Sequence, residues 1–317
     1  MRPSLRSLAL AFAVSLAACS SPEPAQDTQS ASNQVEGTSL LGTELVRRSF
    51  TPEQRTQLDA ELAEAQAAYE RAPLDADSII WYGRRLAYLE RYRDAVEVFT
   101  EGVEKHPDDP RMYRHRGHRY ITLRMFDDAL ADFQYAARLI EGTGNEIEPD
   151  GRPNARNIPL STLHGNVYYH LALTHYLRGE YDESLDAWNK ALGAATNDDS
   201  RVAVNDWRYM TLRRLGRDHE AQAIANGVSE SLDIIENTAY YRRLLMYKGV
   251  VQPEELLDRN EVDDLQFATQ GYGVGNWYLE NGEEERGREI FRRIVESPYW
   301  AAFGYIAAEA DLARAGS

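Results

Sequence analysis

Apolar residues recur every three or four positions along most of the chain after Phe50, and polar residues fill the positions between them. This spacing gathers the apolar side chains on one face of an α-helix. No stretch alternates apolar and polar residues with the β-branched enrichment of a strand, so the pattern predicts an all-α fold without a sheet. Thr51 and Pro52 supply a start signal for the first helix, which we expect to end near Arg71.

A second pattern, with a period of 34 residues, relates small and aromatic positions to one another. Four pairs repeat at this distance: Gly83 and Gly117, Ala95 and Ala129, Phe99 and Phe133, and Gly102 and Ala136. A small residue lets two antiparallel helices approach closely, and an aromatic ring fills the space between them. These positions resemble the tetratricopeptide repeat (TPR). The resemblance implies a right-handed α-solenoid of helical hairpins, each burying its apolar face against its neighbours.

The register of these pairs divides residues 49–317 into five hairpins and an insertion. The predicted repeats cover residues 76–109, 110–143, 165–198, 202–235 and 268–301. The third repeat has Trp188 at the aromatic position, and the fourth has Ala225 there, so we expect its packing to be weaker. A final helix, Phe303 to Arg314, would cap the stack. The insertion, residues 144–164, contains three prolines and either shapes a groove or only joins the two halves.

The N-terminal residues have the pattern of a bacterial lipoprotein signal. Residues 1–18 contain two arginines and then 11 apolar or small residues, fewer than the ~20 that span a membrane, so we expect a signal peptide. Leu16-Ala17-Ala18-Cys19 resembles a lipobox, and Cys19 is the only cysteine. The resemblance implies that Cys19 is lipidated, and Ser20 after it implies an outer-membrane lipoprotein facing the periplasm. An incidental cysteine behind an ordinary signal peptide is the alternative.

The segment after the cysteine has the composition of a tether. Ser20 to about Ser39 contains hardly any large apolar side chains with which to build a core. We therefore expect residues 19–48 to be the lipidated cysteine followed by a disordered tether. Some twenty such residues reach roughly 25 Å, enough to separate the folded part from the lipid headgroups.

The negative net charge argues against some classes of binding partner. The chain has 317 residues, with 35 basic and 51 acidic side chains and a net charge of -16. A field of this sign repels nucleic acids and anionic lipid surfaces, so we expect no nucleic-acid partner. The expected route to the membrane is the N-terminal lipid.

The outward face of the first helix in each hairpin is the predicted binding surface. In the TPR family this face lines a concave groove, and the matching residues are Arg84, Tyr88, Arg111, Arg114, His118, Tyr169, Tyr176, Arg213, Arg214, Tyr272 and Asn276. Arginine binds carboxylates through paired hydrogen bonds and tyrosine supplies contact area, so we expect a protein or peptide partner, acidic or bound by its C-terminus. Ile80 and Arg84 stand where the family's carboxylate clamp has lysine and asparagine, so that clamp does not transfer. An ordinary solvated surface is the alternative, because all but three basic residues are arginine.

Metal-binding and catalytic sites have no supporting pattern. His115 and His118 are three residues apart on one helix face, but no third ligand has a matching spacing and arginines surround them. His170 and His175 point to different helix faces. The glycines between 271 and 275 lack the Lys-Ser/Thr of a nucleotide loop. We therefore expect no metal, no cofactor and no catalytic residue.

These features predict a membrane-anchored TPR adaptor or scaffold in the cell envelope. Nearly the whole mature chain resembles bacterial TPR lipoproteins without a settled biochemical role, for example at 113–120, 149–154 and 302–310. The alternative is a permanent structural subunit of an envelope assembly machine, such as a pilus, outer-membrane or cell-wall complex. A subunit would be unstable alone, whereas an adaptor would be a stable monomer with salt-sensitive binding. An enzyme would need a convergent polar pocket, which helical periodicity does not reveal.

Overall fold

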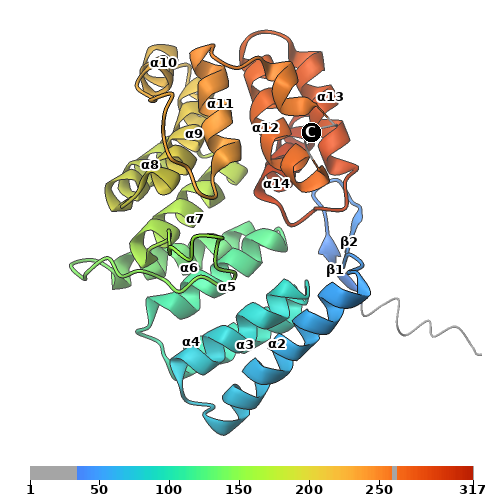
Figure 1. Cartoon of the computed structure of the whole chain (residues 1–317), viewed down its shortest axis with the longest axis vertical. Helices are drawn as coiled ribbons and strands as arrows, with labels where there is room; N and C mark the ends of the chain where they lie inside the picture. The colour runs from blue at the N-terminus through green and yellow to red at the C-terminus, as the bar shows by residue number, and fades with distance from the viewer. Residues whose placement is uncertain (1–33, 259–262, 317) are drawn as a thin grey trace, which may run out of the picture. The chain divides into compact units, whose positions relative to one another are not determined.

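Paired antiparallel helices follow one another along most of the chain (Figure 1). The structure is a computed structural model that describes residues 34–258 and 263–316. Residues from Val35 onward form one compact unit, and its described part contains thirteen α-helices. The expected all-α solenoid of TPR-like hairpins is therefore confirmed.

The first helices begin and end at clear sequence signals. They are α2 (Pro52–Arg71), α3 (Ala76–Tyr88), α4 (Tyr92–Lys105), α5 (Pro110–Thr122) and α6 (Phe126–Leu139). Thr51 caps α2 by accepting a hydrogen bond from the backbone of Gln54, and Asp75 and Asp109 cap α3 and α5 in the same way. Two hairpins, α3 with α4 and α5 with α6, thus occupy the segments expected for the first two repeats.

The 34-residue period corresponds to one packing contact that is made twice. Gly83 of α3 lies so close to Phe99 of α4 that an added Cβ would come within 2.5 Å of the ring. Gly117 of α5 faces Phe133 of α6 in the same way, at 2.9 Å. Both rings are buried. Glycine is needed at these positions because any side chain would push the paired helices apart.

The next four helices continue the stack less regularly. They are α7 (Leu163–Arg178), α8 (Tyr181–Ala194), α9 (Asp198–Arg214) and α10 (Asp218–Asn226). Trp188 is buried at the aromatic position of α8. Ser184, where the repeat has alanine, donates its hydroxyl hydrogen to the carbonyl oxygen of Ala172 at 2.8 Å. A hydroxyl is therefore tolerated at this buried contact because it is hydrogen-bonded.

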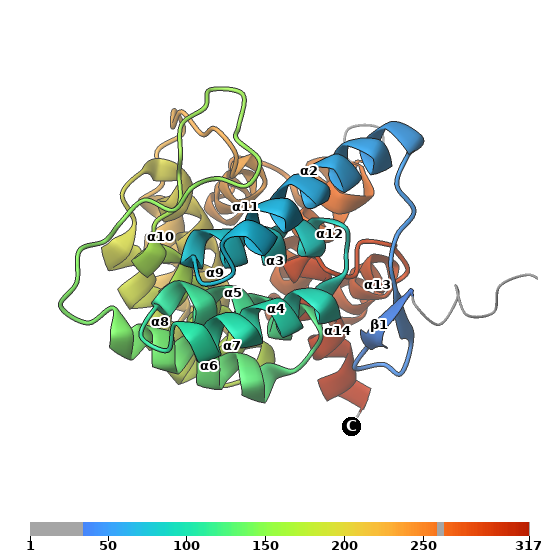
Figure 2. The ribbon, with the colours of Figure 1, turned by 90° about the horizontal axis from the view of Figure 1, so that it is seen from below.

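The C-terminal part packs back on the earlier helices. It consists of α11 (Thr238–Lys248), the short 3₁₀-helix η1 (Pro253–Leu257), α12 (Asp264–Glu280), α13 (Glu284–Val295) and α14 (Phe303–Gly316). Residues 304–311 of α14 are all buried, and α14 packs against α12, α13 and also α7 (Figure 2). Glu309 of α14 forms a buried ion pair at 2.6 Å with Arg124, in the turn between α5 and α6. Helix α14, which was expected to cap the end of the stack, is therefore also buried inside the fold.

A small β-hairpin precedes α2, so the expected absence of any sheet and the expected tether are wrong from Val35 to residue 48. Strand β1 (Val35–Thr38) pairs antiparallel with β2 (Glu44–Val46). Leu45 is buried in the core, and the indole of Trp300 donates a hydrogen bond to the carbonyl oxygen of Val46 at 2.7 Å. Strands of three or four residues are too short for a periodic signal, and their partners lie far along the chain.

The lipoprotein predictions concern a part of the chain outside the described residues. The signal peptide, Cys19 and the tether up to residue 33 all fall there. Among the helices that are described, none is long and apolar enough to cross a membrane.

Candidate functional site

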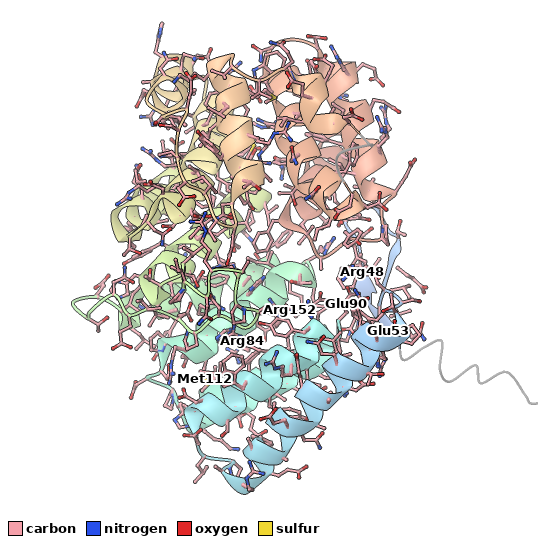
Figure 3. All side chains as sticks on the ribbon, viewed as in Figure 1. Arg48, Glu53, Arg84, Glu90, Met112 and Arg152 are labelled. Atoms are coloured by element: carbon pink, nitrogen blue, oxygen red, sulfur yellow. The ribbon has the colours of Figure 1, made fainter. Side chains whose placement is uncertain are left out.

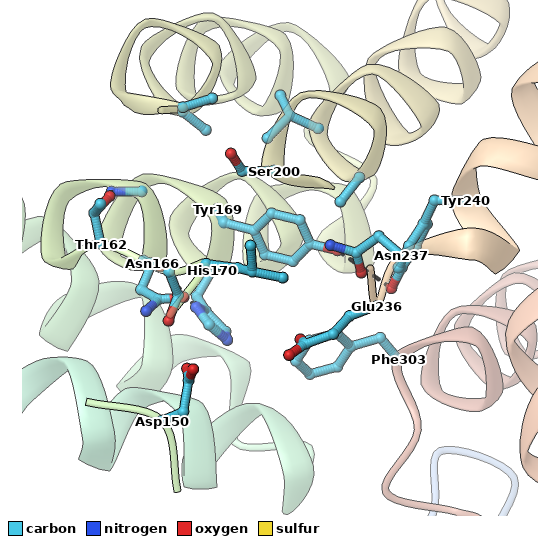
Figure 4. Close-up of a pocket in the computed structure, with 17 residues that line it drawn as sticks. Asp150, Thr162, Asn166, Tyr169, His170, Ser200, Glu236, Asn237, Tyr240 and Phe303 are labelled. Carbon is cyan, nitrogen blue, oxygen red and sulfur yellow. Dashed lines mark hydrogen bonds between the residues drawn. The ribbon is translucent and has the colours of Figure 1, made fainter. Parts of the chain in front are cut away.

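A pocket opens where the insertion meets α7, α9 and the segment that leads into α11 (Figure 4). It contains about 850 Å³ of unfilled space and opens to solvent. Its lining combines carboxylates, amides and hydroxyls with three aromatic rings, and no lysine or arginine is among the lining residues. An aromatic and apolar wall with a few placed polar groups is typical of a binding pocket.

Helix α7 supplies one wall. Asn166, Tyr169 and His170 lie at positions i, i+3 and i+4, so their side chains share one helix face. The helix starts directly after the insertion, where the side chain of Thr162 accepts a hydrogen bond from the backbone of Gly165 at 3.2 Å. This cap fixes where the α7 wall begins relative to the insertion.

The insertion forms a second wall and is anchored by polar contacts. The backbone N–H of Glu148 donates to the carbonyl oxygen of Ser161 at 3.0 Å. The buried carboxylate of Glu148 pairs with Arg114 of α5 at 3.0 Å and accepts a hydrogen bond from Asn166. These contacts carry Asp150 to the edge of the pocket. The insertion therefore lines a pocket of the described structure in addition to joining two parts of the stack.

The far rim is held by one buried carboxylate. Asp199 of α9 accepts hydrogen bonds from the backbone N–H groups of Ile235 at 3.0 Å, Glu236 at 2.7 Å and Asn237 at 2.8 Å. The carboxylate therefore satisfies three donors just before α11 and fixes the side chains of Glu236 and Asn237 at the pocket. Asn154 of the insertion donates to Glu236 at 2.7 Å, which joins the two rims.

Aromatic rings form the back of the pocket. The ring of Tyr169 meets Trp188 edge to face, with centroids 4.9 Å apart. The hydroxyl of Tyr169 lies 3.5 Å from that of Tyr240 on α11. Phe303, the first residue of α14, lies 5.6 Å from the ring of His170, also edge to face. Since these rings pack on one another, the wall is preformed.

Three histidines on α5 and α7 stay neutral: His170, which lines the pocket, and His115 are buried, and His118 is half-buried. His170 donates from Nδ1 to the carbonyl oxygen of Asn166 at 2.6 Å, and burial lowers its pKa to about 3. His118 packs against the ring of His170, with centroids 4.5 Å apart. Burial, followed by nearby arginines, lowers the pKa of His115 and His118 well below the usual range. Across the described ranges, no group of three or more His, Cys, Asp and Glu side chains could hold a metal ion.

The arginines expected to line an open groove all have partners within the chain. These partners are the carbonyl oxygen of Pro149 for Arg84, Asp77 and Asp109 for Arg111, Glu148 for Arg114, Asp218 for Arg213, and Glu280 and Asp311 for Arg214. Figure 3 shows Arg84 and Arg152 near α3. Arg84 donates a hydrogen bond to the hydroxyl of Tyr88 at 3.3 Å, and the guanidinium carbon of Arg152 lies 5.2 Å from the centroid of the Tyr88 ring. An acidic peptide would have to displace contacts that the chain already makes.

Three of the predicted groove residues cannot contact a partner in this structure. Tyr176, Tyr272 and Asn276 have exposed fractions of 0%. The prediction is wrong for them because α14 packs against both α7, which carries Tyr176, and α12, which carries Tyr272 and Asn276. The hydroxyl of Tyr272 is hydrogen-bonded to that of Tyr176 at 2.7 Å and to the carboxylate of Asp311 at 3.0 Å. Tyr169 is the only one of the eleven predicted residues that lines the pocket.

Most residues of the pocket were not identified from the sequence. Asp150 lies in the insertion and Asn166 follows it, and the prolines of the insertion together with Asp150-Gly151 were the available signal. Glu236, Asn237 and Tyr240 lie in and after an irregular segment that breaks the repeat pattern. Periodicity does not show which irregular segments meet in space.

Solved structures similar to this chain share little of its sequence. No family model and no curated protein matches the chain. Among solved structures, YrrB, described as a TPR protein with an unusual peptide-binding site, is 16% identical, with 73% of this chain and 91% of that chain covered and a TM-score of 0.42. A TPR protein from Parabacteroides merdae is 16% identical over 80% of this chain and 94% of its own, with a TM-score of 0.49. MamA is 14% identical over 67% and 90%, with a TM-score of 0.41.

Proposed function

We propose that the protein is a lipid-anchored scaffold of the cell envelope, and that it binds a segment of a protein partner in the pocket between the insertion, α7 and α9. The observation that carries this proposal is the construction of the pocket. Buried groups outside the cavity hold its walls, while polar and aromatic groups face the open space. A preformed cavity of this kind lowers the entropic cost of binding.

The partner expected from the sequence was acidic, and the structure shifts this expectation. The arginines that would have bound carboxylates are engaged by the insertion, by α14 and by neighbouring loops. The open space lies instead beside Tyr169, Tyr240 and Phe303. We therefore propose that the partner segment enters this pocket and does not lie along the arginines.

Site-specific photocrosslinking in intact cells tests the binding site. A photoreactive amino acid in place of Tyr240, which lines the pocket, should capture a defined partner. The same replacement at Tyr168, which lies outside the pocket on α7, is the matched control. Equal capture from both positions would contradict the proposal. Partners that resist stringent washing, from a protein that is unstable alone, would favour the structural-subunit alternative.

A blocking substitution gives an independent test. Ala195 lines the pocket, so Ala195→Trp should fill part of it and abolish capture of the partner. Ala194→Trp, one residue earlier and outside the lining, is the matched control and should leave capture intact. Capture that survives Ala195→Trp in a folded protein would remove the pocket from the proposed function.

The membrane attachment is tested separately. Cys19→Ala should release the protein from the membrane fraction into the soluble fraction and prevent labelling by a radioactive fatty acid, since two or three acyl chains provide the proposed anchor. Density-gradient separation of inner and outer membranes, with protease added to intact and opened cells, tests the proposed periplasm-facing placement. Continued membrane association of the Cys19→Ala variant would contradict the anchor.

A further inference from the structure

We propose that the pocket recognises a positively charged group, the side chain of a lysine or arginine on the bound segment. This inference rests on the proposed function and gives the chemistry of the same site. It reverses the sign of the partner expected from the sequence.

The charges of the lining are the first argument. Asp150 and Glu236 are both lining residues and come from opposite rims, whereas none of the described residues that line the cavity is a lysine or an arginine. The Asp150 carboxylate has no hydrogen bond or ion pair with another described residue. Burial raises the pKa of Asp150, and the charge of Arg84 partly opposes this rise. Arg84 itself donates a hydrogen bond to the carbonyl oxygen of Pro149 at 2.9 Å. Two carboxylates beside an open cavity attract a cation and repel a third carboxylate.

The hydrogen-bonding capacity of His170 is the second argument. Because Nδ1 of its ring donates to the carbonyl oxygen of Asn166, the neutral ring offers Nε2 as an acceptor. No other described residue is hydrogen-bonded to this Nε2. Figure 4 shows the imidazole of His170 and the carboxylate of Asp150 directed into the same space. The pocket therefore presents acceptors to a guest, and ammonium and guanidinium groups are donors without acceptors.

The aromatic wall is the third argument. Tyr169, Tyr240 and Phe303 all line the cavity. The face of an aromatic ring attracts a cation, and the methylene groups of lysine and arginine pack well against such rings. Arg243 already lies over one face of Tyr240, with 4.8 Å from its guanidinium carbon to the ring centroid. The rings of Tyr169 and Phe303 are therefore the surfaces available to the guest.

Titration with short peptides tests the inference directly. The probes are capped pentapeptides, Gly-Gly-X-Gly-Gly, in which X is arginine, lysine, glutamine or glutamate. We expect the arginine and lysine peptides to bind at least about tenfold more tightly than the glutamine and glutamate peptides, a difference that a charged contact in a pocket typically provides. Chemical-shift changes of the amides of Gly165 and Asn237 would report binding at this site.

Variants of the two carboxylates separate charge from folding. Asp150→Asn with Glu236→Gln should reduce the preference for arginine and lysine by about tenfold or more while leaving the circular dichroism spectrum unchanged. Glu141→Gln, at an exposed carboxylate outside the pocket, is the matched control and should keep the preference. Equal binding of all four peptides to the wild-type protein would overturn the inference.

The outcomes also distinguish this inference from the proposed function. If Ala195→Trp abolishes partner capture but the double carboxylate variant binds the arginine peptide as the wild type does, only the cation inference fails. If capture is unaffected by Ala195→Trp and no peptide shifts the pocket amides, both fail. Loss of arginine binding in the double variant, together with loss of capture, supports both.

Discussion

The two hairpins α3–α6 and the closing region, defined here as the β-hairpin with α11–α14, are built in different ways. In α3–α6, an aromatic ring meets a glycine only 16 residues away, as Phe99 meets Gly83, and the contact recurs 34 residues later. In the closing region, buried polar groups join residues far apart, as Glu309 joins Arg124. The first kind of contact is apolar and local. The second is ionic and long-range, so it decides where the end of the stack is placed.

Two turns connect these regions. Glu90 and Arg124 lie 34 residues apart and both have a positive φ, 58° and 65°, which non-glycine residues rarely adopt. Glu90 forms an ion pair with Arg48, after the β-hairpin, and Arg124 forms one with Glu309. The two turns therefore share a backbone conformation but form ion pairs with different parts of the chain. Through these ion pairs the regular hairpins hold the segment after the β-hairpin and the C-terminal helix α14 in place.

The largest expected effect is at the local contact. Phe133→Ala should lower the free energy of unfolding by about 3 to 5 kcal/mol, because the ring is fully buried and its removal leaves a cavity between α5 and α6. Chemical denaturation followed by circular dichroism measures this change. Phe126→Ala, at a partly exposed ring, is the control and should cost clearly less. A loss below about 1 kcal/mol for Phe133→Ala would contradict the packing described for α3–α6.

A comparable loss is expected at the long-range contact, with a different response to a second substitution. Glu309→Ala leaves Arg124 buried without its partner and should cost about 3 to 5 kcal/mol. Replacing both residues by leucine should recover much of this loss, because the unpaired charge is then gone. Denaturation of the single and double variants measures the coupling. If the double variant is no more stable than Glu309→Ala, the ion pair is not what fastens α14.

Acid should weaken the region around the pocket. The unfolded chain binds a proton at each histidine below about pH 6.5, but buried His170 binds one only near its pKa of about 3, so stability is lost as the pH falls. Between pH 7 and pH 5 this histidine should account for roughly 2 kcal/mol. Unfolding measured at both pH values should show a smaller difference for His170→Gln than for the wild type. His219→Gln, at an exposed position, shows the effect of losing a histidine on the surface. An unchanged pH dependence in His170→Gln would show that His170 is not held neutral.

The smallest effect is expected at the tip of the insertion. Arg156 and Asp233 form an ion pair whose side chains are both largely exposed. Asp233→Asn should therefore change the free energy of unfolding by less than about 1 kcal/mol. It should still increase amide hydrogen exchange in the insertion, because one of its outer contacts is lost. An effect as large as that of Glu309→Ala would mean that exposed and buried ion pairs contribute alike here.

The regular part of the fold could be predicted because its main contacts join residues that are close together in the sequence. Gly83 with Phe99 and Gly117 with Phe133 are close in sequence, so the size of each residue is constrained at a fixed spacing. The N-caps of the first helices are local too, since Thr51 bonds a backbone group three residues away. The β-hairpin could not be predicted in this way, because Leu45 and Val46 contact residues that are far away in the sequence.

The candidate site could be predicted only in part for the same reason. The outward face of α7 follows from helix geometry, and Tyr169 was found in this way. The same geometry also selected Tyr176 on α7 and Tyr272 on α12, which are buried where these helices meet α14. Helix periodicity shows which side chains share a face, but it does not show what covers that face.

The amino-acid sequence by itself determined the helical hairpins and their period, because these depend on residues that are near neighbours in the chain. The lipidated N-terminus stays a prediction from the sequence. The tertiary structure alone decided which arginines are engaged, which tyrosines are buried and where a cavity is left. Those outcomes depend on an insertion that directly precedes α7 in the chain and on a C-terminal helix far from it in sequence, both of which contact α7. Which segments pack against each other depends on many long-range contacts together, and it cannot be read from any single stretch of sequence.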